Sequence, residues 1–204
     1  NMNTNEVISN RSNEILGHKI GEKFPVHPND HVNLGQSSND TFPTSINIAI
    51  CLDLKKKLYP ELIALSKSLR KKVSEFKNII KIGRTHLQDA TPITLGQEFS
   101  GYLNMVENSI DRIKDSEKYV RSLPQGGTAV GTGINTHPQF GKLISQELSK
   151  HTGIKFKEAK NHFEAQATQD SVLQVSGSIR GLAVSLSKIA NDIRLLGSGP
   201  RAGI

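Results

Sequence analysis

Apolar residues recur along most of the chain at steps of three and four, the spacing that places side chains on one face of a helix. The sharpest pattern lies in residues 172–196, where the alternation continues for over three heptads. A second regular stripe predicts a long helix over about 94–121. Narrow, sustained stripes of this kind predict the seam of a packed helical bundle.

Shorter helices are predicted in the first part of the chain. Residues 4–16 are typical of the tail of a helix that stops near Gly17. Its apolar stripe consists of Val7, Ile8, Ile15 and Leu16. A second helix runs from about residue 40 toward residue 58, with Pro43 in its first turn, where proline is tolerated. We expect Pro60 to break or kink this helix before a further apolar segment follows.

The remaining segments complete an all-α prediction. Residues 138–152 predict a shorter helix that Gly153 closes, and residues 79–82 form a short apolar run that suits a strand. Few other segments alternate with period two, which is the period of a strand. We therefore predict a long-helix bundle connected by polar loops.

Three polar loops separate the predicted helices, at residues 27–41, 83–92 and 123–138. The first loop ends in five small polar residues at the start of a helix, namely Ser37, Ser38, Asn39, Asp40 and Thr41. Such residues cap helix N-termini, because their side-chain oxygens accept hydrogen bonds from backbone N–H groups that lack a partner. A helix N-terminus with uncommitted hydroxyls and amides also favours an anion. Composition leaves both interpretations open, an ordinary cap and an anion site.

The charge balance bears on possible partners. The chain has 26 lysines and arginines against 19 acidic residues, a net charge of +7. A basic chain suggests nucleic-acid binding, but aromatic residues make up only 5% and the basic runs at 55–57 and 70–72 are typical of solvated helix faces. We expect no nucleic-acid partner, and an anionic small molecule fits the positive balance at least as well.

Cys51 is the single cysteine among the 204 residues, so no intrachain disulfide can form and a reducing compartment such as the cytoplasm is expected. It falls in an apolar run, where a buried inert thiol is favoured over a nucleophile. No apolar run approaches the roughly 20 residues of a membrane span, so no membrane partner is expected. The chain begins inside a helix-like pattern without a signal peptide, which indicates a fragment.

Neither a nucleotide nor a metal is expected. The glycines of residues 123–138 do not follow a predicted strand in the spacing of a dinucleotide or phosphate-binding motif. The seven histidines include no pair at ligand spacing within one predicted helix, so we expect no metal and no other cofactor. A histidine taken singly most often has a structural role, which we assign to His31 and His137.

Within these polar loops, residues 27–41, 83–92 and 126–136 resemble the signature loops of class II fumarase, in the fumarase/aspartase superfamily of homotetrameric lyases. The resemblance covers essentially the whole chain. Its discriminating stretch is Gly-Arg-Thr-His-Leu-Gln-Asp-Ala at residues 83–90, where His86 occupies a position that aspartases give to glutamine. The sequence Ser-Ser-Asn-Asp at residues 37–40 also resembles fumarase, since aspartases tend to Ser-Thr-Asn-Asp.

The resemblance implies a substrate site. Ser37, Ser38 and Asn39 match residues that hold one substrate carboxylate, and Thr85 matches another substrate contact. His86 matches the catalytic histidine, which is linked to proton transfer on the oxygen of the water that is added or lost. Removal of the C3 proton of malate spreads negative charge into the adjacent carboxylate, which hydroxyls and amide N–H groups stabilise. Departure of hydroxide needs an acid that titrates near neutral pH, as histidine does.

The resemblance also implies a second, non-catalytic carboxylate site near the active-site entrance. It matches His27, Asn29 and Asp30, and Phe24 stands where some relatives have an arginine. Residues 161–165 resemble another loop of the family, but Gln169 stands where a histidine is expected, and we assign it no role.

One family feature is absent from the chain. The general base of the family is a serine on a mobile loop with the pattern Gly-Ser-Ser-x-Met-Pro-x-Lys-x-Asn, and no such pattern occurs in the sequence. The resemblance thus implies a central fragment that is inactive alone. Residues 1–36 would end an N-terminal helical domain, and residues 37–204 would begin the central helical-bundle domain. The long stripes predict self-association, and the resemblance implies a homotetramer in which active sites are shared between subunits.

The implied activity is the reversible hydration of fumarate to (S)-malate, in the cytoplasm or, for a eukaryotic protein, in the mitochondrial matrix. Two other hypotheses stay open: an ammonia lyase of the aspartase type, and a non-catalytic helical scaffold like the lens crystallins derived from this superfamily. His86 favours the hydratase. A full-length chain that lacked the serine loop would favour the scaffold.

Overall fold

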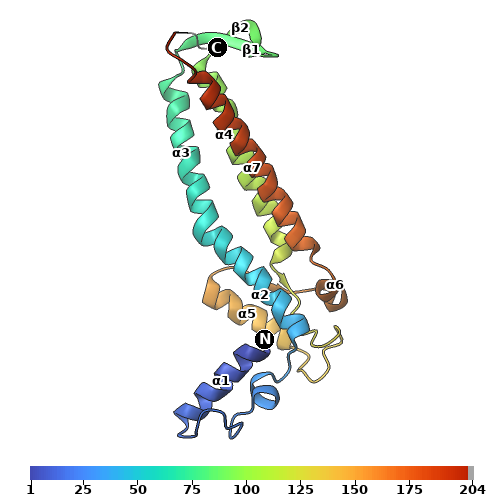
Figure 1. Ribbon diagram of the computed structural model, residues 1–204. Coiled ribbons are helices and arrows are strands. Elements are labelled where there is room, and N and C mark those ends of the chain that lie inside the picture. The colour runs from blue at the N-terminus through green and yellow to red at the C-terminus, as the bar shows by residue number, and fades with distance from the viewer. Residues whose placement is uncertain (202–204) are drawn as a thin grey trace. The chain divides into compact units, whose positions relative to one another are not determined.

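The computed structural model describes residues 1–201, and helices account for most of them, which confirms the all-α prediction (Figure 1). The chain divides into two compact units. The first comprises Asn1–Leu52 and Lys118–Val172, and the second comprises Asp53–Glu117 and Leu173–Ile204. Each unit carries one group of the predicted site residues.

The first unit begins with α1 (Met2–Ile15), which ends as predicted just before Gly17, whose φ is +86°. The predicted apolar stripe of this helix is exposed in the described part of the chain, with Val7 62% and Ile15 70% exposed. The buried face is polar instead and consists of Asn5, Ser9 and Asn13.

These polar side chains form hydrogen bonds with the backbone of the irregular segment that follows α1. Ser9 Oγ donates a hydrogen bond to the carbonyl of Val26 at 2.6 Å, and Asn13 Nδ2 donates to the same carbonyl at 3.0 Å. The segment has backbone groups that no helix or strand satisfies, and amides and hydroxyls satisfy them where apolar side chains cannot. The segment also contains a short π-helix, η1 (Pro28–Val32), which the pattern did not predict.

The rest of the first unit surrounds the glycine-rich loop. Strand β3 (Ser122–Leu123) pairs in parallel with β4 (Lys157–Glu158), and α5 (Phe140–Thr152) ends at Gly153 in the left-handed conformation, as predicted. Helix α6 (His162–Ala167) was not predicted. Residues 123–128 at the start of the loop are buried. Segment 124–139 contains no helix or strand, which agrees with the prediction of a loop.

Proline does not interrupt the chain as strongly as predicted. Helix α2 (Ser38–Asp53) contains Pro43 and continues into a π-helical turn, η2 (Leu54–Leu58), and then into α3 (Tyr59–Glu75). Pro60 lies in the first turn of α3, where its missing N–H costs little. The prediction of a break at Pro60 is therefore wrong, and the departure from α-helical geometry lies just before it, in η2. Cys51 is fully buried, as predicted.

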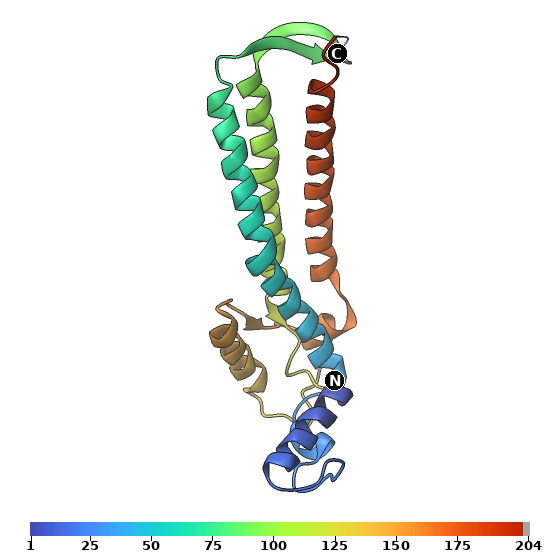
Figure 2. The same ribbon diagram turned by 60° about the vertical axis from the view of Figure 1, so that its left-hand side comes forward.

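In the second unit, α3, α4 (Leu95–Val120) and α7 (Asp170–Leu196) run side by side, as Figures 1 and 2 show. Side chains connect them: the Tyr59 hydroxyl donates to Glu117 Oε2 at 2.5 Å, and the Tyr102 hydroxyl lies 3.0 Å from Asp192 Oδ2. On α7, residues at heptad spacing are buried, namely Val175, Leu182 and Ile189.

An antiparallel hairpin joins α3 to α4. It consists of β1 (Ile80–Thr85) and β2 (Gln88–Thr94), so the predicted strand exists and extends into a stretch that had been predicted as a polar loop. Gly96 permits a close approach of α4 to α3, since a Cβ there would lie 2.8 Å from the carbonyl oxygen of Val73. The hairpin carries the predicted histidine at its turn.

Candidate functional site

The N-terminus of α2 is closed by a reciprocal cap. Ser37 Oγ accepts a hydrogen bond from the backbone N–H of Asn39 at 3.2 Å, and Asp40 Oδ1 accepts one from the backbone N–H of Ser37 at 2.9 Å. This is a capping box in which an aspartate takes the usual place of glutamate. The cap interpretation is therefore confirmed. Because a hydroxyl can accept and donate at once, Ser37 retains its proton for a ligand.

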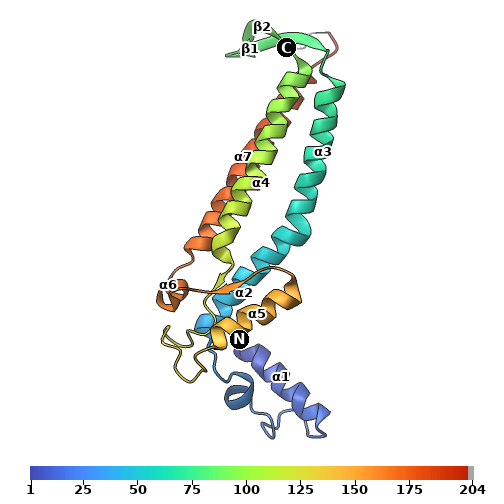
Figure 3. The same ribbon diagram turned by 180° about the vertical axis from the view of Figure 1, so that it is seen from behind.

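The same helix start holds the glycine-rich loop. Asp40 Oδ2 accepts hydrogen bonds from the backbone N–H groups of Gly126 at 3.1 Å and Thr128 at 2.9 Å. Asn39 Nδ2 donates to the carbonyl of Ala129 at 2.7 Å. Figure 3 shows this loop beside the first turn of α2. Two segments that are far apart in sequence thus form one wall.

That wall borders a cavity of about 750 Å³ within the first unit. Ser37 and Ser38, predicted to hold a substrate carboxylate, line it together with Asn29 and Asp30 from the predicted second site. Thr128 lies on the loop side of the same cavity. Hydroxyls and amides at a helix N-terminus suit a carboxylate, because the free N–H groups and the dipole favour negative charge.

His27 has a local role in the structure. Its Nδ1 accepts hydrogen bonds from the backbone N–H groups of Asn29 at 3.3 Å and Asp30 at 3.2 Å, and so caps η1. His31 Nδ1 accepts from the backbone N–H of His27 at 2.8 Å. His137 Nδ1 accepts in the same way from the backbone N–H of Gln139 at 3.2 Å. These contacts fit the structural roles predicted for His31 and His137.

In the second unit, Thr85 and His86 lie at the turn of the hairpin. Thr85 ends β1 and pairs with Gln88, which leaves His86 and Leu87 as the two turn residues. Their φ angles are +54° and +62°, a conformation that hairpin turns require and that asparagine and glycine adopt most easily. A histidine and a leucine there are strained, and such strain often accompanies function. Among residues 1–201, no side-chain hydrogen bond of His86 is found.

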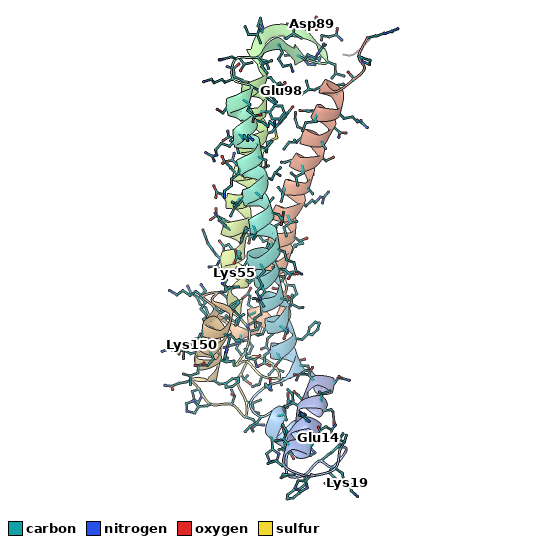
Figure 4. All side chains as sticks on the ribbon, turned by 90° about the vertical axis from the view of Figure 1, so that its left-hand side faces the viewer. Glu14, Lys19, Lys55, Asp89, Glu98 and Lys150 are labelled. Carbon is teal, nitrogen blue, oxygen red and sulfur yellow. The ribbon has the colours of Figure 1, made fainter. Side chains whose placement is uncertain are left out.

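His86 borders a cavity of about 720 Å³ within this unit. Lys81, Arg84 and Lys188 supply positive charge to its lining, and Glu98 and Asp192 supply negative charge. Figure 4 labels Glu98 on α4 and Asp89 on the hairpin. Arg84 Nη1 lies 3.1 Å from Asp89 Oδ1 and donates to the carbonyl of Leu87 at 3.2 Å, so it stabilises the turn.

A buried tyrosine links the acidic groups of this cavity. The Tyr102 hydroxyl lies 3.0 Å from both Glu98 Oε1 and Asp192 Oδ2, and only 2% of Tyr102 is exposed. Burial raises the pKa of Tyr102 well above its usual range, and the hydrogen bonds to the two carboxylates raise it further. Lys81 pairs with Glu98, and Lys188 pairs with Asp192. The network fixes the base of the hairpin to α4 and α7.

Two residues at the first cavity, one buried behind its wall and one in its lining, were not assigned a site role from the sequence. Asp40 was identified only as a capping residue, although its position three residues after Ser37 is the spacing of a capping box. Nothing in the sequence indicates that its second oxygen holds a distant loop. Thr128 carries no local signal, and its φ of +55° depends on contacts far away in sequence.

Residues 1–201 contain neither a candidate metal site nor a candidate membrane span. Within them, no group of three or more histidine, cysteine, aspartate or glutamate residues is placed to hold a metal ion. None of the described helices is long and apolar enough to span a membrane.

Comparison with known proteins places this geometry in a family. A family model described as lyase matches residues 1–204. The chain belongs to this lyase family. It is 60% identical over 203 residues to the mitochondrial fumarate hydratase of Saccharomyces cerevisiae, covering 100% of this chain and 41% of that protein.

Other members of the lyase family show similar identity to the chain. The chain is 56% identical over 204 residues to a class II fumarate hydratase of Brucella suis, covering 100% of this chain and 44% of the relative. The crystal structure of a class II fumarase from Schistosoma mansoni superposes with a TM-score of 0.96 at 42% identity, covering 99% of this chain and 45% of that one. The chain therefore spans less than half the length of these relatives. The resemblance to class II fumarase is confirmed.

Proposed function

We propose that the chain is the central part of a longer fumarate hydratase, which interconverts fumarate and (S)-malate. The observation that carries this proposal is the 60% identity, over the whole chain, to a protein named fumarate hydratase. His86 at the hairpin turn and the serines at the start of α2 supply the residue types that the reaction needs. The aspartase and scaffold alternatives gain no support from the relatives, which are named fumarate hydratases.

The proposed roles follow the chemistry of water addition. The hydroxyls of Ser37 and Ser38 and the amide of Asn39 hold one substrate carboxylate at the N-terminus of α2, where the helix dipole favours negative charge. Thr85 contacts the substrate, and His86 transfers a proton to or from the oxygen of the water that is added or lost. Proton transfer by a positioned histidine is effective near neutral pH. Asn29 and Asp30, with His27 shaping the segment, form a second carboxylate site.

We propose that the protein assembles as a homotetramer with shared active sites. Apolar residues on α7 support self-association: Leu173 is 72% exposed and Val184 64% exposed. Apolar surface in such a stripe is stabilised when another helix covers it. Light scattering after size exclusion tests this, and a folded monomer at micromolar concentration would contradict it. The compartment we propose is the cytoplasm, or the mitochondrial matrix for a eukaryotic protein.

The test of the activity is a fumarate assay on the full-length protein, with and without ammonium. We expect fumarate to be consumed without ammonium and (S)-malate to accumulate, which is followed by the ultraviolet absorbance of fumarate and by chromatography. Turnover that required ammonium and yielded aspartate would favour the ammonia lyase. The 204-residue chain assayed alone should be inactive, because it lacks the serine-loop pattern.

A further inference from the structure

The carboxylate of Asp40 is fully buried and accepts hydrogen bonds from three backbone N–H groups. Its Oδ1 accepts from the backbone N–H of Ser37 at 2.9 Å and lies 3.3 Å from the Thr41 hydroxyl, whose proton also has Gln36 Oε1 within reach at 3.0 Å. Its Oδ2 accepts from the backbone N–H groups of Gly126 and Thr128. An ionised carboxylate can only accept, so each of these donors matches it. One side chain therefore joins the helix start to the glycine-rich loop.

Both of the joined segments line the cavity of the first unit. Ser37 and Ser38 belong to the helix start, and Thr128 and Ala129 belong to the loop. Each oxygen of the Asp40 carboxylate fixes one of the two segments. The position of the cavity's polar wall thus depends on this side chain, together with the bond from Asn39 to the carbonyl of Ala129.

The loop adopts a backbone conformation that its own residues disfavour. Thr128 is β-branched and has a φ of +55°, a conformation that such residues rarely adopt. Gly127 has no room for a side chain, since a Cβ there would lie 2.4 Å from Gln166 Oε1. Gln166 Nε2 in turn donates to the carbonyl of Thr128 at 2.7 Å. External hydrogen bonds therefore hold the loop in place, and the bond from Thr128 N–H to Asp40, at 2.9 Å, is one of them.

The loop also contains a buried side-chain hydroxyl, that of Thr128. Thr128 is 3% exposed, and within residues 1–201 its hydroxyl has no hydrogen-bond partner although it is buried. A buried hydroxyl without a partner is costly, and a ligand that supplied one would recover that cost. A carboxylate in the adjacent cavity is such a ligand.

We propose that Asp40 is a positioning residue of the carboxylate site, and that it sets the affinity for a dicarboxylate by fixing Ser37 and Thr128 on opposite segments of the cavity wall. The proposal rests on the proposed function. Asp40 touches no substrate, because it is fully buried behind the wall. Its effect is therefore on binding, and it acts through the residues that it holds.

The test is Asp40→Asn in the full-length protein. The amide keeps the size of the side chain but turns an NH₂ group toward donors that need an acceptor. Loss of hydrogen bonds to a charged group should raise the KM for fumarate and for malate about tenfold or more, with a smaller change in kcat. The inhibition constant of succinate, a saturated dicarboxylate, should rise in parallel, because it reports binding without chemistry.

Asn47→Ala is the matched control. Asn47 is also buried on α2, and its Nδ2 donates to the carbonyl of Ser122 at 3.1 Å, away from the cavity. Its loss should lower the melting temperature and leave the KM and the succinate constant unchanged. If Asp40→Asn does not fold, Thr41→Val replaces it, because it removes the hydroxyl shared between Asp40 Oδ1 and Gln36 Oε1 and should raise the KM about twofold to threefold.

The outcomes separate the two proposals. A wild-type protein that hydrates fumarate, with an unchanged KM and succinate constant in Asp40→Asn, would overturn the positioning role alone. The same holds if Asp40→Asn does not fold and Thr41→Val leaves both constants unchanged. A wild-type protein with neither turnover nor succinate binding would overturn the proposed function and this inference with it.

Discussion

The start of α2 and the turn of the β1–β2 hairpin both present polar groups to a cavity, but they are stabilised differently. At α2, the buried Asp40 carboxylate and the capping box of Ser37 fix the backbone through hydrogen bonds to two segments. At the hairpin, His86 and Leu87 occupy left-handed conformations on an exposed turn. The predicted anion-binding groups are thus held by hydrogen bonds within the first unit. The predicted acid, His86, lies instead on a strained turn.

The difference fits the chemistry expected of each group. A carboxylate-binding site works by holding donors in fixed positions, so that no reorganisation is needed when negative charge develops. A proton-transferring histidine needs an accessible ring nitrogen, and His86 has no side-chain hydrogen bond within the described residues. Each of the following predictions tests one side of this comparison.

The largest effect is expected at the hairpin turn. Replacement of His86 by asparagine in the full-length protein should lower kcat by about 10²–10⁴-fold, the usual contribution of a positioned acid or base. The KM should change less, since the serines at α2 are the groups proposed to hold the substrate. Steady-state kinetics with fumarate and malate measure both constants.

His27→Asn is the control for this variant. Its Nδ1 caps a short π-helix by accepting backbone hydrogen bonds, so its loss should leave kcat nearly unchanged. Equal losses of kcat in the two variants would contradict the assignment of the chemistry to the hairpin and not to the first unit.

A smaller effect is expected at the base of the hairpin. Tyr102→Phe removes the hydroxyl between the part-buried carboxylates of Glu98 and Asp192, whose single proton serves one of them at a time. The free energy of unfolding should fall by about 1–3 kcal/mol, the contribution of a hydrogen bond to a charged group. Thermal and urea unfolding measure it.

Tyr119→Phe is the matched control, since Tyr119 is 58% exposed. Its effect should stay within about 0.5 kcal/mol, as for most surface substitutions. If Tyr102→Phe is as mild as Tyr119→Phe, the network does not stabilise the second unit. The hairpin would then depend only on its own ladder of backbone hydrogen bonds.

The sequence predicts the long helices well because their apolar periodicity is local and regular. Residues 172–196 and 94–121 correspond closely to α7 and α4. The prediction that Gly17 and Gly153 end helices is also confirmed, since each follows a helix and has a positive φ angle. Each of these signals acts over a few residues and needs no knowledge of the tertiary structure.

The predictions that fail depend on contacts far away in sequence. The stripe of α1 was assigned to apolar residues, but Ser9 and Asn13 are buried because a loop needs their hydrogen bonds. The second role of Asp40 requires the loop some 86 residues away to lie beside it. A capping pattern can indicate the first oxygen of Asp40, but no local pattern indicates the second.

The smallest effect is expected from the strain at Leu87. This residue is 65% exposed and has a φ of +62°, so Leu87→Gly should stabilise the chain slightly. The left-handed conformation costs an L-residue roughly 1–2 kcal/mol, and the greater freedom of glycine in the unfolded chain offsets about 0.5–1 kcal/mol of the gain. The net increase in the free energy of unfolding should be about 0.5 kcal/mol, measured as a higher urea midpoint.

Leu34→Gly supplies the comparison for this last variant. Leu34 is 69% exposed, slightly more than Leu87, but its φ is not positive. Glycine there relieves no strain and only adds freedom to the unfolded chain, so the urea midpoint should fall slightly. Opposite shifts in the two variants would show that the turn stores strain. A fall in both would mean that the Leu87 side chain stabilises the turn by more than its conformation costs, and the contrast between a strained hairpin and a well-satisfied helix start would then fail.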